Sequence, residues 1–353
     1  MGSRWLVFRE RSRLRWGGDL RRHYVLAALA TRTDALDVDG WSFATIDRTI
    51  KLYRGHRWER RPKVAAATML SQDALDLVGS AARPVVVDFH DDAVAQNEAL
   101  GVAVDSAWIS LMTERKRRNL ELFKWHVVPS LQLAALSGLD PARTIIAGNG
   151  SDTNVIGPEP WSSRPTIGLM SGAAPARGIE ALIDASRGIR HEIRDLRLVL
   201  WLAATGAASE SYLTALKASI ADDPWIVVRS TPYADIAHEL GEAWVQVIPT
   251  PASPYWDAVS PIKLYDAMAS GRPVVVTPRT VMSSEVERCQ AGLVSAGDRP
   301  DDLAQQILTL LSDEATARRL GENGRRAVVR DHDWRAISSG LLQEIESREG
   351  SIR

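Results

Sequence analysis

Short apolar runs alternate with longer amphipathic segments from one end of this chain to the other. Such alternation is typical of βα units that build a parallel sheet covered by helices. The first half therefore predicts strands and helices in turn. Strands are predicted at residues 5–8, 85–89, 108–111, 126–129 and 144–147, and the clearest helices at 19–30 and 113–124.

The alternation is interrupted once, at residues 149–165, where the chain reads NGSDTNVIGPEPWSSRP. A segment so rich in Gly, Pro, Ser and Asn predicts a linker. After it the alternation restarts, with two further helical segments behind the last predicted strand. Strands are predicted at 166–170, 196–202, 225–228, 244–248 and 273–277, and helices at 178–187, 210–221, 232–240, 261–270, 300–311, 315–329 and 334–348.

These patterns predict an α/β protein with two doubly wound parallel-sheet domains. A length of 353 residues is long for one domain and suits two. We place the first domain at residues 1–157 and the second at 158–330. Residues 331–353 are expected to form a C-terminal helix that packs back on the first domain.

Composition excludes several classes of protein. The net charge of −1 lacks the basic excess of a nucleic-acid binder. Cys289 is the only cysteine, so no intrachain disulfide can form, which fits a reducing compartment. The basic first residues lack the apolar core of a signal peptide, and no apolar run reaches the roughly 18 residues of a membrane span. We expect a soluble, cytoplasmic protein.

The segment SPIKLYDAMASGRPVVVT, residues 260–277, is the strongest candidate for a binding site. Ser260 can cap a helix and Pro261 can begin it, and the free amides of a helix start attract an anion. Lys263 in the first turn opposes the helix dipole unless something negative lies opposite. Asp266 follows on the same face. A surface Lys–Asp pair on an ordinary helix is the alternative interpretation.

This segment resembles the nucleotide-sugar-binding element of glycosyltransferase family 4, Ser-Pro-x-Lys-x-x-Glu-x-Met-Ala-x-Gly-x-Pro-Val-Val. Other segments resemble further family elements in the right order: the glycine loop at 17–23, the Asn-Gly-x-Asp hinge at 149–152, the basic-Gly turn at 175–179 and the acidic-aromatic element at 331–334. The resemblance implies the GT-B fold, in which two Rossmann-like domains face each other across a cleft. The first would bind the acceptor and the second the nucleotide sugar.

The resemblance also assigns roles to residues. Arg177 and Lys263 would clamp the diphosphate, and His90, after the predicted strand at 85–89, would contact the donor sugar or the reacting centre. Asp266 takes the place of the family's ribose-binding Glu. Residues expected to bind the donor are Gly17, Gly18, Ser230, Thr231, Ser260, Pro261, Ile262 and Asp266.

Glycines also favour an anion on physical grounds, because Gly17 and Gly18 let the backbone approach a phosphate closely. A plain turn between a strand and a helix is the alternative interpretation for this pair. His90 could equally be a loop histidine without a role, or a metal ligand, for which the pattern supplies no partners.

The function implied is a hexosyltransferase of glycan or glycoconjugate biosynthesis that retains the anomeric configuration and needs no metal or other cofactor. Two departures concern catalysis. Ala258 stands where the family often has a Glu, with Asp257 one place off, and Gly172 stands where it often has an Arg. We therefore expect a front-face mechanism. A catalytically inactive GT-B subunit that binds nucleotide sugar or a partner, and a nucleotide-sugar epimerase, remain alternatives.

The acceptor side is less informative. The acceptor is expected to be a small molecule, a saccharide or a lipid-linked compound. Two basic runs, at residues 54–63 and 114–118, are of a kind that is usually solvated. Some family members use such surfaces to meet anionic lipid, which leaves peripheral membrane contact open.

Overall fold

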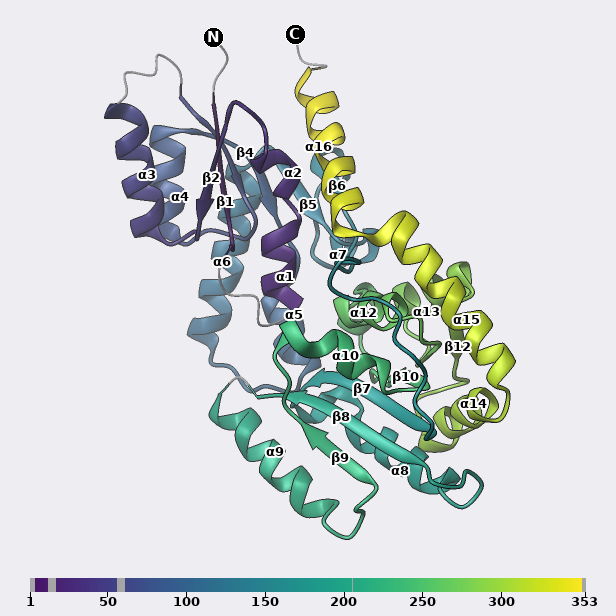
Figure 1. Ribbon diagram of the computed structural model, residues 1–353. Helices are drawn as coiled ribbons and strands as arrows, with labels where there is room; N and C mark the ends of the chain where they lie inside the picture. The colour runs from purple at the N-terminus through teal and green to yellow at the C-terminus, as the bar shows by residue number, and fades with distance from the viewer. Residues whose placement is uncertain (1–3, 12–16, 56–60, 205, 351–353) are drawn as a thin grey trace. The chain divides into compact units, whose positions relative to one another are not determined.

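The computed structural model describes residues 4–11, 17–55, 61–204 and 206–350 (Figure 1). The chain divides into two compact units. The first contains Met1–Asn97, Ala103–Asn149 and Trp334–Arg353, and the second contains Glu98–Val102 and Gly150–Asp333. Apart from Glu98–Val102, the chain passes between the units after Asn149 and after Asp333, whereas the boundaries predicted from the sequence follow residues 157 and 330.

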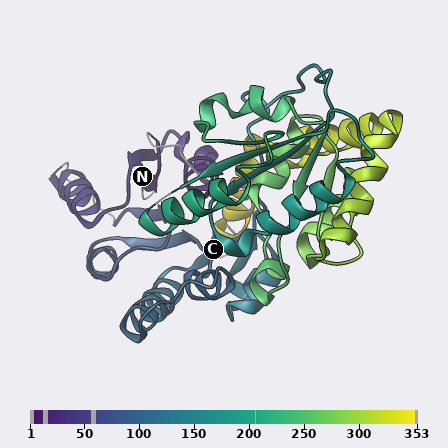
Figure 2. The same cartoon turned by 90° about the horizontal axis from the view of Figure 1, so that it is seen from below.

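The first unit is built on a six-stranded sheet of order β2-β1-β3-β4-β5-β6, in which every pairing is parallel. Helices cover both of its faces (Figures 1 and 2). The strands are β1 Trp5–Arg9, β2 Ala35–Asp39, β3 Lys63–Ala66, β4 Arg83–Asp88, β5 Trp125–Val128 and β6 Thr144–Ile146. The helices are α1 Gly17–Tyr24, α2 Ala27–Ala30, α3 Phe43–Gly55, α4 Gln72–Ala81, α5 Ala93–Ala99, α6 Ser106–Leu122, α7 Leu131–Leu136 and α16 Trp334–Gly350.

Successive side chains of a strand point to opposite faces of its sheet. On β1, Leu6 and Phe8 accordingly join one buried cluster, which includes residues of α3 and α4. Val7 joins the other cluster, which includes Leu341 and Ile345 of α16. Ser338 of α16 also accepts a hydrogen bond from the backbone of Ala28, at 2.7 Å. The C-terminal helix is therefore an integral part of the first unit.

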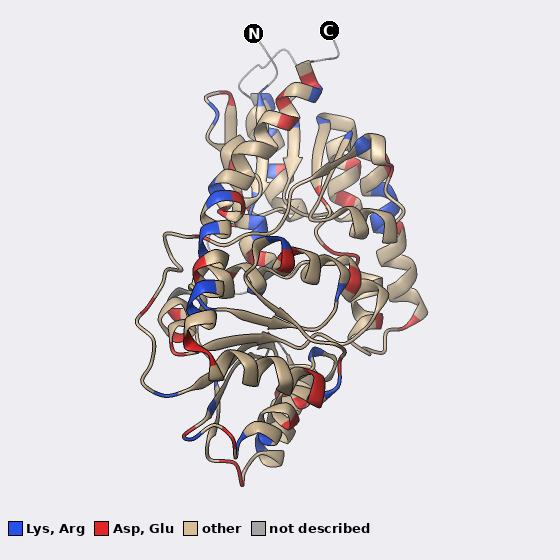
Figure 3. Ribbon diagram, turned by 90° about the vertical axis from the view of Figure 1, so that its right-hand side faces the viewer, with Lys and Arg blue, Asp and Glu red and all other residues tan. Residues whose placement is uncertain are grey.

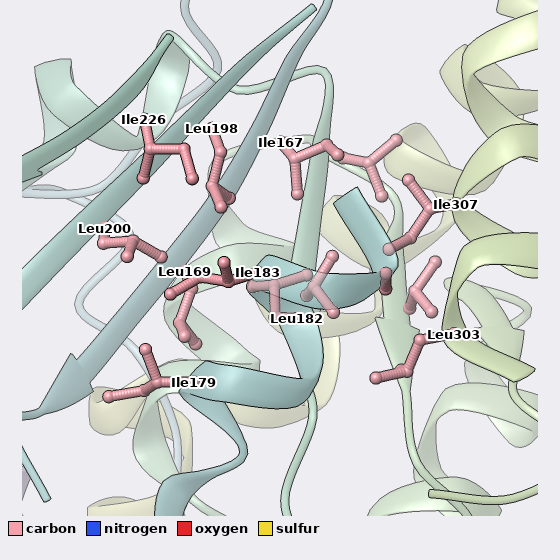
Figure 4. Packing of buried hydrophobic residues seen from close by; sticks show 14 of the residues in the cluster. Ile167, Leu169, Ile179, Leu182, Ile183, Leu198, Leu200, Ile226, Leu303 and Ile307 are labelled. Carbon is pink, nitrogen blue, oxygen red and sulfur yellow. The ribbon is translucent and has the colours of Figure 1, made fainter. Parts of the chain in front are cut away.

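The second unit repeats the design with a parallel sheet of order β12-β11-β10-β7-β8-β9. Figure 4 shows one of its two core clusters, with Ile167 and Leu169 of β7 packed against side chains of α8 and α14. The strands are β7 Thr166–Gly172, β8 Arg197–Ala203, β9 Ile226–Arg229, β10 Val245–Ile248, β11 Val274–Val276 and β12 Gly292–Val294. The helices are α8 Ile179–Ile189, α9 Ala207–Ser219, α10 Ile236–Gly241, α11 Pro254–Ala258, α12 Ile262–Ala269, α13 Thr280–Cys289, α14 Pro300–Ser312 and α15 Glu314–Ala327.

The predicted strand at 108–111 is wrong, because these residues lie in α6. Asp105 caps this helix by accepting from the backbone N–H of Trp108 at 2.6 Å. Three strands, β2, β3 and β12, were not predicted. The predicted linker also makes specific contacts: Ser151 forms a parallel bridge with Asp333, and its N–H donates to the carbonyl of His332 at 2.9 Å.

Candidate active site

A tight turn at the carboxyl end of β7 carries the first cation of the site. Arg177 ends the short 3-10 turn Pro175–Arg177, and Gly178 follows with φ of 73°. A Cβ at this glycine would lie 1.7 Å from the carbonyl oxygen of Pro249, so only glycine fits. The turn therefore fixes the backbone of Arg177. The guanidinium carbon of Arg177 lies 4.7 Å from the centre of the Trp256 ring.

The second cation, Lys263, lies in the first turn of α12, with its Nζ atom 3.4 Å from Oγ of Ser171. Burial, together with the charge of Arg177, lowers the pKa of Lys263 to about 7. No carboxylate of the described residues forms an ion pair with Lys263. Two cations held together at a helix start form a site to which an anion would restore the charge balance.

Asp266 is buried, with an exposed fraction of 1%. Its Oδ1 atom accepts from the hydroxyls of Ser151 at 2.7 Å and Tyr233 at 3.3 Å. Oδ2 has no hydrogen-bond partner among the described residues. Burial is the main cause that raises the pKa of Asp266 to about 7. The alternative of a surface Lys–Asp pair is therefore wrong, and Oδ2 is the oxygen left to accept from a ligand.

We expect Asp266→Asn to change how stability depends on pH. Since the folded-state pKa of about 7 exceeds the ordinary 3.8, wild-type stability is full below pH 4 and is lost as the pH rises through 7. The variant has no carboxyl to ionise, so its stability should not fall in this range. Relative to wild type, its free energy of unfolding should rise by about 2–4 kcal/mol between pH 4 and pH 8. Urea unfolding at both pH values measures the change. Asp301→Asn, at an exposed carboxylate, is the control. If the pH dependence of the unfolding free energy changed equally in both variants, burial of Asp266 would not be its cause.

The remaining predicted donor residues of the second unit lie at α12 and at the loop after β9. Pro261 occupies the N-cap position of α12, which begins at Ile262. Ser260 is buried, and its Oγ atom lies 2.8 Å from the hydroxyl of Tyr265. Ser230 and Thr231 begin the loop after β9, and Tyr233 of the same loop contacts Asp266. The fold thus brings this loop against the helix.

In the first unit, the structure gathers predicted residues around the end of β4. Nδ1 of His90 lies 3.3 Å from Asp88, and its Nε2 atom lies 3.4 Å from Arg22 of α1. Gly17 and Gly18 form the first turn of α1. A Cβ at Gly18 would lie 3.3 Å from the end of the Arg22 side chain. This helix start and His90 therefore share one neighbour, Arg22.

Arg21 is a central residue of this region that sequence reasoning did not single out. It is 1% exposed and donates to both oxygens of Asp88 at 2.7–3.1 Å. It also donates to the carbonyl oxygens of Ala147 and Gly148 and to Oδ1 of Asn149. Burial alone would raise the pKa of Asp88, but Arg21 and His90 together outweigh it and hold the pKa below its ordinary value.

Asp257 does not join the two cations. Its Oδ1 atom lies 3.7 Å from Arg279 and accepts from the backbone N–H of Thr280 at 3.3 Å, at the start of α13. The neighbouring Ala258 is buried, and Gly172 ends β7. These contacts give Asp257 a structural role at a helix start.

The basic run at 114–118 is not a free positive patch. Arg117 pairs with Glu114 and Glu121, while Lys116 pairs with Asp92 and Arg118 with Asp76. Arg115 donates to the carbonyl oxygens of Met69 and Leu70. In the other run, residues 56–60 lie outside the described part of the chain. Basic and acidic residues, blue and red, alternate along the ribbon in Figure 3. The described cations thus lend no support to membrane contact.

A metal could be held at one place among the described residues. Ligand atoms of Glu285, Cys289 and His332 lie within 4.8 Å of one another. The guanidinium of Arg288 already lies there, 2.6 Å from Glu285 and 3.1 Å from His332. Arg288 thus contacts two of the three groups that could hold a metal. None of the described helices combines the length and the apolar character needed to cross a bilayer.

Comparison with known proteins agrees with this architecture. Residues 164–313 match the family model described as glycosyl transferases group 1. These residues include Arg177, Lys263 and Asp266. The chain is 30% identical over 216 residues to the MMP alpha-(1->4)-mannosyltransferase of Mycolicibacterium hassiacum. The match spans 59% of this chain and 49% of the mannosyltransferase, about half the relative's length.

Two solved structures match over nearly all of both chains. Sucrose-phosphate synthase from Thermosynechococcus elongatus has a TM-score of 0.73 at 16% identity, with 99% of this chain and 100% of the other covered. HepE of Anabaena in complex with UDP and glucose has a TM-score of 0.72 at 16% identity. The match covers 98% of this chain and 100% of the HepE chain. The predicted GT-B fold, with two Rossmann-like parallel-sheet units, is confirmed.

Proposed function

We propose that this chain is a glycosyltransferase that transfers a hexose from a nucleoside-diphosphate sugar to a hydroxyl of an acceptor. The proposal draws support from the family model, which matches most of the second unit, and from the mannosyltransferase relative. A small molecule, a saccharide or a lipid-linked compound is the expected acceptor. We place the enzyme in the cytoplasm, a reducing compartment, because a chain with a single cysteine forms no intrachain disulfide.

The observation that carries the proposal is the pair of cations Arg177 and Lys263. When a nucleotide sugar reacts, negative charge develops on the departing diphosphate, and donors held in place beforehand stabilise it. Lys263 is half-buried near a second cation, so a bound diphosphate would restore its full charge. The Oδ2 atom of Asp266, one turn along the same helix, would accept a hydrogen bond from a ribose hydroxyl.

A front-face, retaining reaction suits these residues. A two-step route to retention needs a carboxylate below the anomeric carbon. At the place where the related motif has one, Ala258 has none, and Asp257 is bonded to Arg279 and Thr280. In a front-face reaction the acceptor approaches on the side of the leaving diphosphate, whose oxygen takes the proton. That route asks the protein only for positioning and charge stabilisation.

Incubation with UDP-, GDP-, ADP- and dTDP-hexoses tests this proposal. We expect slow hydrolysis of one donor and its transfer once an acceptor is found, with activity unchanged by EDTA because cations of the protein meet the phosphate charge. Binding without turnover would favour the inactive-subunit alternative, and isomerised donor the epimerase. Loss of activity in EDTA with recovery in Mn²⁺ would contradict metal independence. Proton NMR of the fresh product, made from an α-linked donor, should show an α-linkage.

A further inference from the structure

Trp256 is placed and buried in a way that core packing alone does not explain. It lies on the short helix α11, where Ser253 caps the helix by accepting from the Trp256 backbone N–H at 3.0 Å. The side chain is 5% exposed, and the ring of Tyr255 packs edge-on against it, 4.9 Å away. Its ring N–H has no hydrogen-bond partner among the described residues. Its aromatic face is directed to Arg177.

The Arg177 guanidinium is held near a second cation, Lys263. A long arginine side chain loses rotamer freedom when it is fixed, and like charges repel one another. The repulsion is expressed in the lowered pKa of Lys263, to which Arg177 contributes. An aromatic face attracts a guanidinium through its quadrupole and leaves the net positive charge in place.

We propose that Trp256 is a positioning residue of the diphosphate site, whose buried indole face holds the Arg177 guanidinium beside Lys263. The backbone of Arg177 is fixed by the Gly178 turn against Pro249, and the side chain is fixed by Trp256. The inference rests on the proposed function, because it takes the anion to be the diphosphate of a nucleotide.

Titration calorimetry with UDP and GDP tests the inference without turnover. We expect Trp256→Leu to weaken binding of the nucleotide that wild type prefers by about tenfold, the effect of losing a desolvated cation–π contact. Trp256→Phe keeps an aromatic face and should stay within about threefold of wild type. A double-mutant cycle then separates positioning from general damage. In the Arg177→Ala background, Trp256→Leu should have no further effect on Kd.

Trp225→Leu is the matched control, since Trp225 makes a cation–π contact with Arg190 in the same unit, with 5.4 Å between guanidinium carbon and ring centre. It should leave Kd unchanged. Equal losses in the Phe and Leu variants, or additive losses of Trp256→Leu and Arg177→Ala, would overturn the inference. Tighter binding by Trp256→Leu would also overturn it, because Trp256 would then keep Arg177 away from the diphosphate. If wild type binds neither UDP nor GDP, the proposed function fails as well. If wild type binds a nucleotide and the Trp256 variants bind it with the same Kd, the proposed function stands and this inference fails.

Discussion

Replacing Lys263 by alanine is expected to lower kcat by about a hundredfold, with a smaller effect on donor binding. One donor held toward the developing charge of a transition state is worth about 3 kcal/mol, and Lys263 is held at a helix start beside Arg177. Steady-state kinetics with the donor found in the nucleotide-sugar panel measures the change. Lys217→Ala removes an exposed lysine of α9 and should be silent. An unchanged kcat in Lys263→Ala would show that the diphosphate binds elsewhere.

The same lysine gives a pH signature. Its pKa of about 7 in the free protein should rise when a diphosphate binds, because an opposite charge favours the protonated form. Affinity is therefore full below pH 7 and falls as the pH rises above 7 toward the pKa of the bound state. Between pH 7 and 9, Kd for the nucleoside diphosphate should rise in wild type. This slope should be absent in Lys263→Ala.

Replacing Arg21 by alanine is expected to cost the first unit about 3–5 kcal/mol of stability, because it leaves the Asp88 carboxylate buried without its arginine partner, with only His90 beside it. Three further acceptors, at Ala147, Gly148 and Asn149, lose their donor in the same variant. Urea denaturation measures the loss. An exposed pair serves as the control: Arg117→Ala breaks contacts to Glu114 and Glu121 and should cost less than about 1 kcal/mol.

A second variant separates the buried charge from the packing. Arg21→Met combined with Asp88→Leu removes both ions and fills their space with apolar atoms. Since a buried pair can be replaced with little loss whereas a broken one is costly, the double variant should be more stable than Arg21→Ala. A double variant as unstable as the single one would assign the role of Arg21 to its carbonyl contacts.

Strands with a long apolar run could be predicted from the sequence. β8, for example, is apolar without interruption from Leu198 to Ala203. β2 was missed because Asp37 and Asp39 break its apolar run. Asp37 is there because Arg9 donates to it from the neighbouring strand. The error at 108–111 arose because four apolar or small residues fit a strand and a helix turn equally well.

Residues of the candidate site could be predicted only where neighbouring residues in the sequence show why they are there. Lys263 could be found because its place in the first helix turn needs a negative partner. Asp266 could be found, but not its donors, since Ser151 lies 115 positions away in the chain. Trp256 was hidden among twelve tryptophans that look like core residues. Arg21 was hidden because sequence gives an arginine no sign of burial.

The short bridge between Ser151 and Asp333 has a consequence for the modularity of the chain. Apart from Glu98–Val102, the second unit is one continuous stretch from Gly150 to Asp333, and Ser151 and Asp333 pair where this stretch begins and ends. Thr153 strengthens the pairing, because its N–H and hydroxyl both donate to Asp333. Residues 150–333 are thus a cassette with adjoining ends, inserted into the sequence of the first unit. Such a cassette can be exchanged between chains as one block.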